Sequence, residues 1–234
     1  MNTTPAVTAD RRAKWMPATL GILLALLVFC ILFGLVDQAY IRFIDARFPA
    51  VGDSAALATL YGLVSRAHLI LPLLALALWR PRRLGFQMGQ TRRYWRMLLV
   101  MLVANCGIVA GYLLLSGSTT PYSGNQWLLT EVVTVPLVEE TMWRGAVFAA
   151  LLLAFRRIYP EGRALTWAMW SSGIAFGLLH GGNALVGVPL AFVAVQVLNA
   201  TVWGVVYGYA RARTDSLYPP ILLHAAMNLV VVLL

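Results

Sequence analysis

Residues 127–155 read WLLTEVVTVPLVEETMWRGAVFAALLLAF, an apolar segment interrupted by charged residues. It is long enough to cross a bilayer as a helix, for which about 20 apolar residues suffice. Yet it carries two adjacent glutamates, Glu139 and Glu140, and Arg144 one turn later. An ionisable side chain in hydrocarbon costs about 2.5–3.5 kcal/mol, so such groups indicate a functional site. Pro136 precedes the glutamates and predicts a kink there.

The composition is that of a membrane protein. Of the 234 residues, 60% are hydrophobic and 12% are charged, whereas a soluble domain carries about 25% charged residues. Continuous apolar runs favour helices over a barrel, whose strands are about half as long and alternate. The sequence therefore predicts an all-α, polytopic membrane helix bundle with about seven transmembrane helices. These are expected at 16–36, 55–79, 95–115, 127–155, 164–181, 187–210 and 217–234.

The expected helices form a single domain. Residues 1–126 supply the first three helices, and residues 127–234 supply the four helices of the functional core. The apolar run that follows Lys14 is too long for the core of a signal peptide, and no small-residue cleavage site follows it. We therefore expect it to be retained as the first helix.

The basic residues that give the net charge of +9 lie mostly between the expected helices. Basic residues cluster before residue 16, across 80–96, across 156–163 and at 211–213, whereas 116–126 and 182–186 contain none. The positive-inside rule then predicts a cytoplasmic N-terminus and a C-terminus outside. Because the basic residues lie at the ends of apolar segments, they do not indicate nucleic-acid binding.

Two later apolar segments each carry a histidine. Phe176 precedes His180 by four residues, and His224 precedes Asn228 by four, so each pair shares one helix face. A lone histidine in a membrane helix is at least as often a hydrogen-bonding group between helices as it is a catalytic residue. Two histidines, an asparagine and a carboxylate pair together provide a base, a partner that orients water and donors for an oxyanion.

Helical spacing separates the two glutamates. Glu140 and Arg144 are four residues apart with the acid first, the favourable order for an ion pair. Glu139 points about 100° away from Glu140. We expect Arg144 to neutralise Glu140 and leave Glu139 available for chemistry. The alternative is an architectural ion pair beside a second acid that faces water.

Together, E-E-x-x-x-R, F-x-x-x-H and H-x-x-x-N, in this order, resemble the three motifs of the CPBP family. This family comprises the type II CAAX prenyl endopeptidases and the bacterial bacteriocin-processing and immunity (Abi) proteins. The resemblance covers roughly residues 127–234. It implies an intramembrane endopeptidase of the bacterial inner membrane. Its partners would be membrane lipid and a peptide or protein substrate, which could be lipidated or membrane-anchored.

The resemblance implies roles for individual residues. Glu139 would be the catalytic glutamate, working with His180 to activate water, while His224 and Asn228 would stabilise the oxyanion. The supporting motif positions would be Glu140, Arg144 and Phe176. No cofactor is favoured, because a glutamate-activated water needs no metal and the H-E-x-x-H zinc motif is absent from the sequence. Zinc is the alternative, with Glu139, His180 and His224 as its ligands.

Two readings other than a protease stay open. One is a non-catalytic immunity or scaffold protein of the same family, which keeps the polar cluster for folding. The other is a small transporter that uses Glu139 and Glu140 for proton coupling. Transport would favour an inverted repeat, and the sequence shows none. Motifs typical of aspartyl (G-x-G-D) and rhomboid-type serine (G-x-S-G) intramembrane proteases are also absent from the sequence.

Arg66 and His68 form another ionisable group inside an expected span. Either both face the cavity and bind a substrate carboxylate, or Arg66 pairs with Glu131. His180 lies near the outer end of its expected helix. Either that helix begins deeper or the 181–186 connection dips inward as buried irregular backbone. Cys30 and Cys106 lie in apolar spans and are expected to be inert packing residues.

Overall fold

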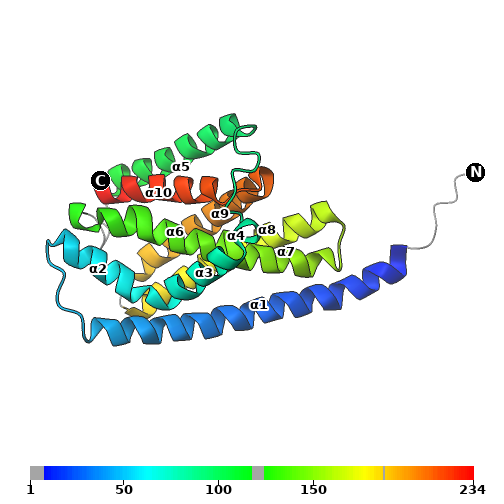
Figure 1. Ribbon diagram of the computed structural model, residues 1–234, viewed down its shortest axis with the longest axis horizontal. Helices are drawn as coiled ribbons and strands as arrows, with labels where there is room; N and C mark the ends of the chain where they lie inside the picture. The colour runs from blue at the N-terminus through cyan, green and yellow to red at the C-terminus, as the bar shows by residue number, and fades with distance from the viewer. Residues whose placement is uncertain (1–7, 118–123, 187) are drawn as a thin grey trace, which may run out of the picture.

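The computed structural model describes residues 8–117, 124–186 and 188–234, which contain helices and no strand (Figure 1). The predicted all-α class is confirmed. Three helices are long and apolar enough to cross a membrane, and a bent pair would make a fourth span. The number of seven spans stays a prediction. The three long helices are α1 (Thr8–Asp45), α5 (Trp95–Ser116) and α9 (Leu190–Thr214).

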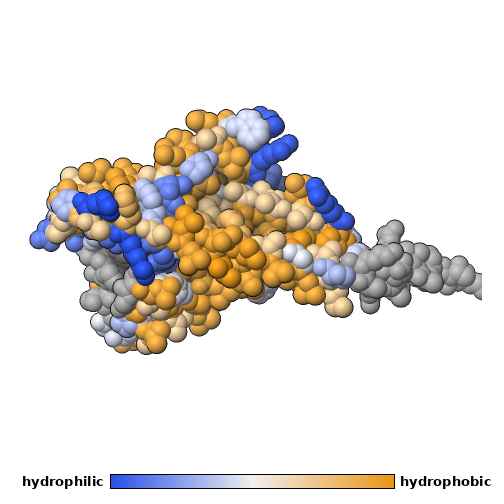
Figure 2. Space-filling view, turned by 90° about the horizontal axis from the view of Figure 1, so that it is seen from below, coloured by the Kyte–Doolittle hydropathy of each residue, from blue (hydrophilic) through white to orange (hydrophobic). Residues whose placement is uncertain are grey.

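The exposed surface supports a membrane location. Seen from the side of α1, the molecule presents a broad hydrophobic face, with hydrophilic residues toward its edges (Figure 2). Large apolar side chains on α1, such as Leu20, Leu24 and Leu35, are more than half exposed. An apolar face of this extent needs a lipid or protein partner to shield it from water. The protein is therefore a membrane protein.

The prediction of one helix over 55–79 was wrong. The chain instead forms α2 (Ala55–Ser65) and α3 (Ala67–Trp79), which meet at Arg66 with a bend of 68°. The Tyr40 hydroxyl donates to the carbonyl of Val64 at 2.9 Å and so satisfies a backbone group in the last turn of α2. The first helix was also predicted too short at 16–36, because α1 continues through its polar end to Asp45.

The segment predicted as a helix over 127–155 is helical but irregular. Two π-helical segments, η2 and η3, lie on either side of the short α-helical turn α6, which contains Pro136 and both glutamates. Proline lacks a backbone N–H and so disturbs the helical ladder. π-helical turns occur often at functional sites. The elements are η1 (Asn125–Trp127), η2 (Thr130–Thr134), α6 (Val135–Glu140), η3 (Thr141–Val147) and α7 (Phe148–Arg156).

The remaining elements bring the later motifs to α6. Helix α8 ends before His180, and a 3₁₀ helix, η4, follows it and packs against α9. Helix α10 packs against α5, α6, η2 and α9, so its motif lies beside the glutamates (Figure 1). The bounds are α8 (Glu161–Leu179), η4 (His180–Val186) and α10 (Tyr218–Leu233). The α4 turn (Pro81–Leu84), which was not expected, precedes α5.

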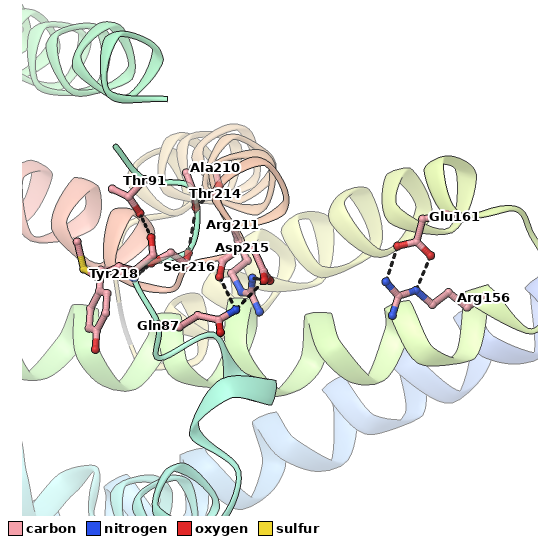
Figure 3. A network of polar contacts seen from close by, with 11 residues as sticks. Gln87, Thr91, Arg156, Glu161, Ala210, Arg211, Thr214, Asp215, Ser216 and Tyr218 are labelled. Atoms are coloured by element: carbon pink, nitrogen blue, oxygen red, sulfur yellow. Dashed lines mark hydrogen bonds and ion pairs between the residues drawn. The ribbon is translucent and has the colours of Figure 1, made fainter. Parts of the chain in front are cut away.

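Hydrogen bonds tie the α4–α5 connection to the turn between α9 and α10. The Gln87 amide donates to the Asp215 carboxylate at 2.6 Å, and Arg211 donates to the same carboxylate at 2.9 Å (Figure 3). Arg156 and Glu161 form a separate exposed ion pair between α7 and α8. The Arg156 hydrogen bond lowers the pKa of the Glu161 carboxyl. Arg211 and Arg156 are thus each paired with an acid that is close in sequence.

Glycines allow α8 and α9 to pack closely. A Cβ added at Gly173 would lie 2.6 Å from the backbone nitrogen of Val205, and one at Gly204 would lie 2.8 Å from the Gly173 carbonyl. Gly177, one turn after Gly173, is similarly crowded by Thr201. Small residues spaced four apart are a common means of close helix contact in membranes.

We expect Gly173→Ala to lower thermal stability in detergent. The added methyl group meets backbone atoms that cannot rotate away, and overpacking of this kind costs about 1–3 kcal/mol. The matched control is Gly107→Ala in α5, where an added Cβ meets nothing within 4 Å. That control should be neutral or slightly stabilising, because alanine is the better helix former by about 1 kcal/mol. Equal melting temperatures for the two variants would contradict the close α8–α9 contact.

Candidate functional site

Glu140 is the centre of a buried polar network. Its Oε1 atom accepts from Arg144 Nη1 at 3.1 Å and from His224 Nδ1 at 2.9 Å. Glu140 and Arg144 are fully buried, and His224 is 5% exposed. The ion pair predicted from the spacing of Glu140 and Arg144 is therefore present. The structure adds that the same carboxylate holds the histidine of α10.

The Phe176 ring lies among three of the polar side chains. The Arg144 guanidinium carbon is 4.3 Å from the centroid of this ring, which suits a cation–π contact. The centroid of the His180 ring lies 4.8 Å from that of Phe176, and the centroid of His224 lies 6.3 Å from it. The structure therefore brings the two motif histidines, from the end of α8 and from α10, around one aromatic ring.

A backbone hydrogen bond orients His180. Its Nδ1 atom is 2.9 Å from the carbonyl oxygen of Phe176. A carbonyl only accepts, so Nδ1 carries the proton and Nε2 keeps a free lone pair. His180 begins η4, which packs against both α8 and α9. In this tautomer, Nε2 is the nitrogen that can accept a proton from water.

Asn228 and His224 each have capacity left for a ligand. The Asn228 amide donates to the backbone carbonyl of Glu131 at 2.8 Å, which uses one of its two N–H groups. His224 uses Nδ1 for Glu140, which leaves Nε2. These two side chains lie one turn apart on α10, and both are buried. The second N–H of Asn228 can donate to a substrate oxygen, and so can Nε2–H of His224 when the ring is doubly protonated beside the Glu140 carboxylate.

Glu139 differs sharply from its neighbour. It is half-buried, and the described part of the chain gives it no hydrogen-bond partner. Its charge acts on two other carboxylates, those of Asp37 and Glu131. Its side chain therefore lies in a polar region that contains further acids. The sharing of one water by Glu139 and His180 stays a prediction.

Two buried residues near His224 were missed by the sequence analysis. The Tyr207 ring lies 5.8 Å from the His224 ring, and its hydroxyl accepts from the Asn105 amide at 2.6 Å. Asn105 also donates to the carbonyl of Leu223, next to His224. Asn105 gave a usable signal, because it is a lone amide in an apolar helix. Tyr207 gave none, because aromatic residues are common in such helices.

The two readings of Arg66 and His68 can be compared with the structure. Within the described ranges, Arg66 forms no ion pair with Glu131, although its charge acts on that carboxylate. Its hydrogen bond is a long one of 3.4 Å to Ser65. His68 instead bonds to Asp37 of α1 at 3.0 Å. Asp37 was also missed, because it lies one residue beyond the predicted end of the first helix.

The proposed zinc ligands are not gathered in a coordination sphere. Across residues 8–117, 124–186 and 188–234, no group of three or more histidine, cysteine, aspartate or glutamate side chains is placed to hold a metal ion. Of the set Glu139, His180 and His224, the last is bonded through Nδ1 to Glu140. Binding zinc with this set would require the three side chains to move together.

The C-terminal part of the chain is similar to one known protein family. A family model described as type II CAAX prenyl endopeptidase Rce1-like matches residues 121–230. This segment includes all three motifs and nearly the whole of the expected core, so the predicted resemblance is confirmed. No curated protein and no solved structure matches the chain. Helices α1 to α5 lie outside the matched segment.

Proposed function

We infer that the chain, whose residues 121–230 match a model described as type II CAAX prenyl endopeptidase Rce1-like, belongs to this family of proteases. On this premise we propose an intramembrane endopeptidase that hydrolyses a peptide bond of a membrane-associated protein or peptide by a glutamate-activated water. The observation that carries the proposal is the different environment of the two adjacent glutamates. Glu140 is locked in a buried network with Arg144 and His224, while the adjacent Glu139 is half-buried and, among the described residues, unbonded.

In the proposed mechanism, Glu139 accepts a proton from the attacking water, and His180 Nε2 orients that water. The remaining N–H of Asn228 and Nε2–H of His224, which acts in its doubly protonated form beside Glu140, stabilise the oxyanion that forms on the substrate carbonyl. Glu139 then returns the proton to the leaving amine. Glu140 contributes by fixing His224 in place.

The membrane arrangement belongs to the same proposal. We propose that the chain crosses the bacterial inner membrane about seven times, with its N-terminus in the cytoplasm and its C-terminus outside. The alternative function, a non-catalytic immunity or scaffold protein, keeps the Glu140 network for folding and gives Glu139 no role.

The proposal is tested by cleavage of defined peptides in lipid nanodiscs. Three internally quenched probes would be compared: a farnesylated peptide that ends in a CAAX sequence, the same peptide without the lipid, and an apolar membrane-spanning peptide. We expect at least one probe to be cut at a single bond, identified by mass spectrometry. Glu139→Gln protein, prepared in the same way, should leave it intact. Equal product from both proteins would point to a contaminating protease and against the proposal.

Activity is expected to survive exhaustive chelation. A catalytic zinc typically needs three protein ligands and an open position, whereas the proposed glutamate base needs none. The measurement is elemental analysis of active protein together with cleavage rates after prolonged treatment with 1,10-phenanthroline. Zinc should be well below one atom per chain. One zinc per chain, with activity lost on chelation and restored by zinc, would replace the glutamate mechanism by the metal one.

A further inference from the structure

Three ionisable residues outside the matched segment form an N-terminal cluster: Asp37 of α1, Arg66 at the bend, and His68 of α3. His68 Nε2 donates to Asp37 Oδ1 at 3.0 Å, and the two side chains are only 16% and 24% exposed. Ionisable groups at membrane depth are costly to keep and mark functional regions. The proposed mechanism does not use any of the three.

Tyr40 braces the cluster. Its ring centroid lies 4.3 Å from that of His68, and its hydroxyl bonds to the carbonyl of Val64 just before the bend. Helix α1 thus holds both sides of the 68° bend, α2 through Val64 and α3 through His68. Helix α3 in turn packs against α6, which carries Glu139. The cluster therefore fixes the position of the bend relative to α6.

The cluster faces the carboxylates of the site. Asp37 and Glu131 each lie within electrostatic reach of both Arg66 and Glu139, so the four side chains share one region. Glu139 repels both Asp37 and Glu131 when these acids are ionised. Arg66 is the permanent cation there, and no carboxylate among the described residues pairs with it at ion-pair distance. Its charge is thus available to the whole group rather than to one partner.

We propose that Asp37, Arg66 and His68 are positioning residues for the reaction at Glu139. The Asp37–His68 bond holds the bend against α6. Arg66 offsets the repulsion that Asp37 and Glu131 exert on Glu139, so that Glu139 keeps its orientation. They touch no reacting atom. This inference rests on the proposed function, and it extends the active site to helices outside the matched family segment.

Kinetics of Arg66 variants provide the first test. Arg66→Gln should lower kcat by about 10- to 100-fold with little change in KM. Displacing the base Glu139 slows the chemical step but does not weaken substrate binding. Arg66→Lys keeps the charge and should recover most of that loss. His68→Phe keeps the ring beside Tyr40 but removes the donor to Asp37, and it should lower kcat in the same way. The matched control, Glu161→Gln, breaks an exposed ion pair and should leave kcat unchanged. An unaltered kcat in Arg66→Gln, or no recovery with lysine, would overturn the proposal.

A second readout does not depend on activity. Position 139 would carry the only cysteine, through Glu139→Cys in a Cys30→Ser, Cys106→Ser background, and its rate of reaction with a maleimide would be measured. Adding His68→Phe should raise this rate several-fold, because losing the hydrogen bond to Asp37 releases the bend from α6. If the wild type cleaves no probe but labelling still accelerates, the proposed function fails and the positioning of α6 by the cluster stands. An unchanged labelling rate would overturn the positioning role whatever the cleavage result.

Discussion

Glu139→Gln is expected to lower kcat by about 10²- to 10⁴-fold, the range that a general base contributes. Glutamine keeps the size of glutamate but cannot accept a proton from water. Glu139 is half-buried and has no hydrogen-bond partner in the described part of the chain, so its loss should not weaken the fold. The melting temperature in detergent should therefore stay at the wild-type value. Cleavage of the best probe peptide and thermal unfolding would be measured on the same preparations.

The adjacent Glu140→Gln variant is the matched control, because it makes the same change one residue away. Glu140 holds Arg144 and His224 in a buried network. A neutral glutamine would leave the buried Arg144 charge uncompensated, so we expect a lower melting temperature. Loss of activity in Glu140→Gln should therefore accompany loss of folded protein. If Glu139→Gln instead remains active while Glu140→Gln is stable and inactive, the roles of the two glutamates are reversed.

Features that depend on local spacing could be predicted from the sequence. The i,i+4 arrangement of Glu140 and Arg144 is enough to predict their pairing, and the apolar runs are enough to predict the helical class. The same-face spacing of Phe176 and His180 also holds, since the histidine ring packs on the phenylalanine ring. Each of these inferences needs only the geometry of one helix.

The features that could not be predicted depend on contacts between distant segments. The bend at Arg66 is stabilised by the Asp37–His68 and Tyr40–Val64 hydrogen bonds, which join residues 31 and 24 positions apart. A hydropathy pattern treats 55–79 as one uninterrupted span because it contains no such information. The Glu140–His224 bond likewise joins residues that are 84 positions apart. Helical spacing assigned Glu140 to Arg144 but could not show that it has a second partner.

Replacing Arg144 should cause the largest loss of stability. Arg144→Ala leaves Glu140 as a buried carboxylate without its cation, which costs about 3–5 kcal/mol. The guanidinium also packs over the rings of Phe176 and Tyr207, at 4.3 and 5.5 Å from their centroids, so the truncation opens a cavity as well. Thermal unfolding in detergent should show a large drop, with less folded protein recovered from the membrane.

The control for Arg144 is Arg156→Ala, which removes an arginine from an exposed pair with Glu161. Surface ion pairs contribute about 0–1 kcal/mol, so this variant should melt close to the wild type. Arg144→Lys should fall between the two, because a lysine restores the charge but lacks the planar group that stacks on Phe176. An Arg144→Ala protein that is as stable as the wild type but inactive would contradict the structural role. Arg144 would then act on the substrate directly, and Glu140 would have to be compensated by a protonated His224, its other partner in the buried network.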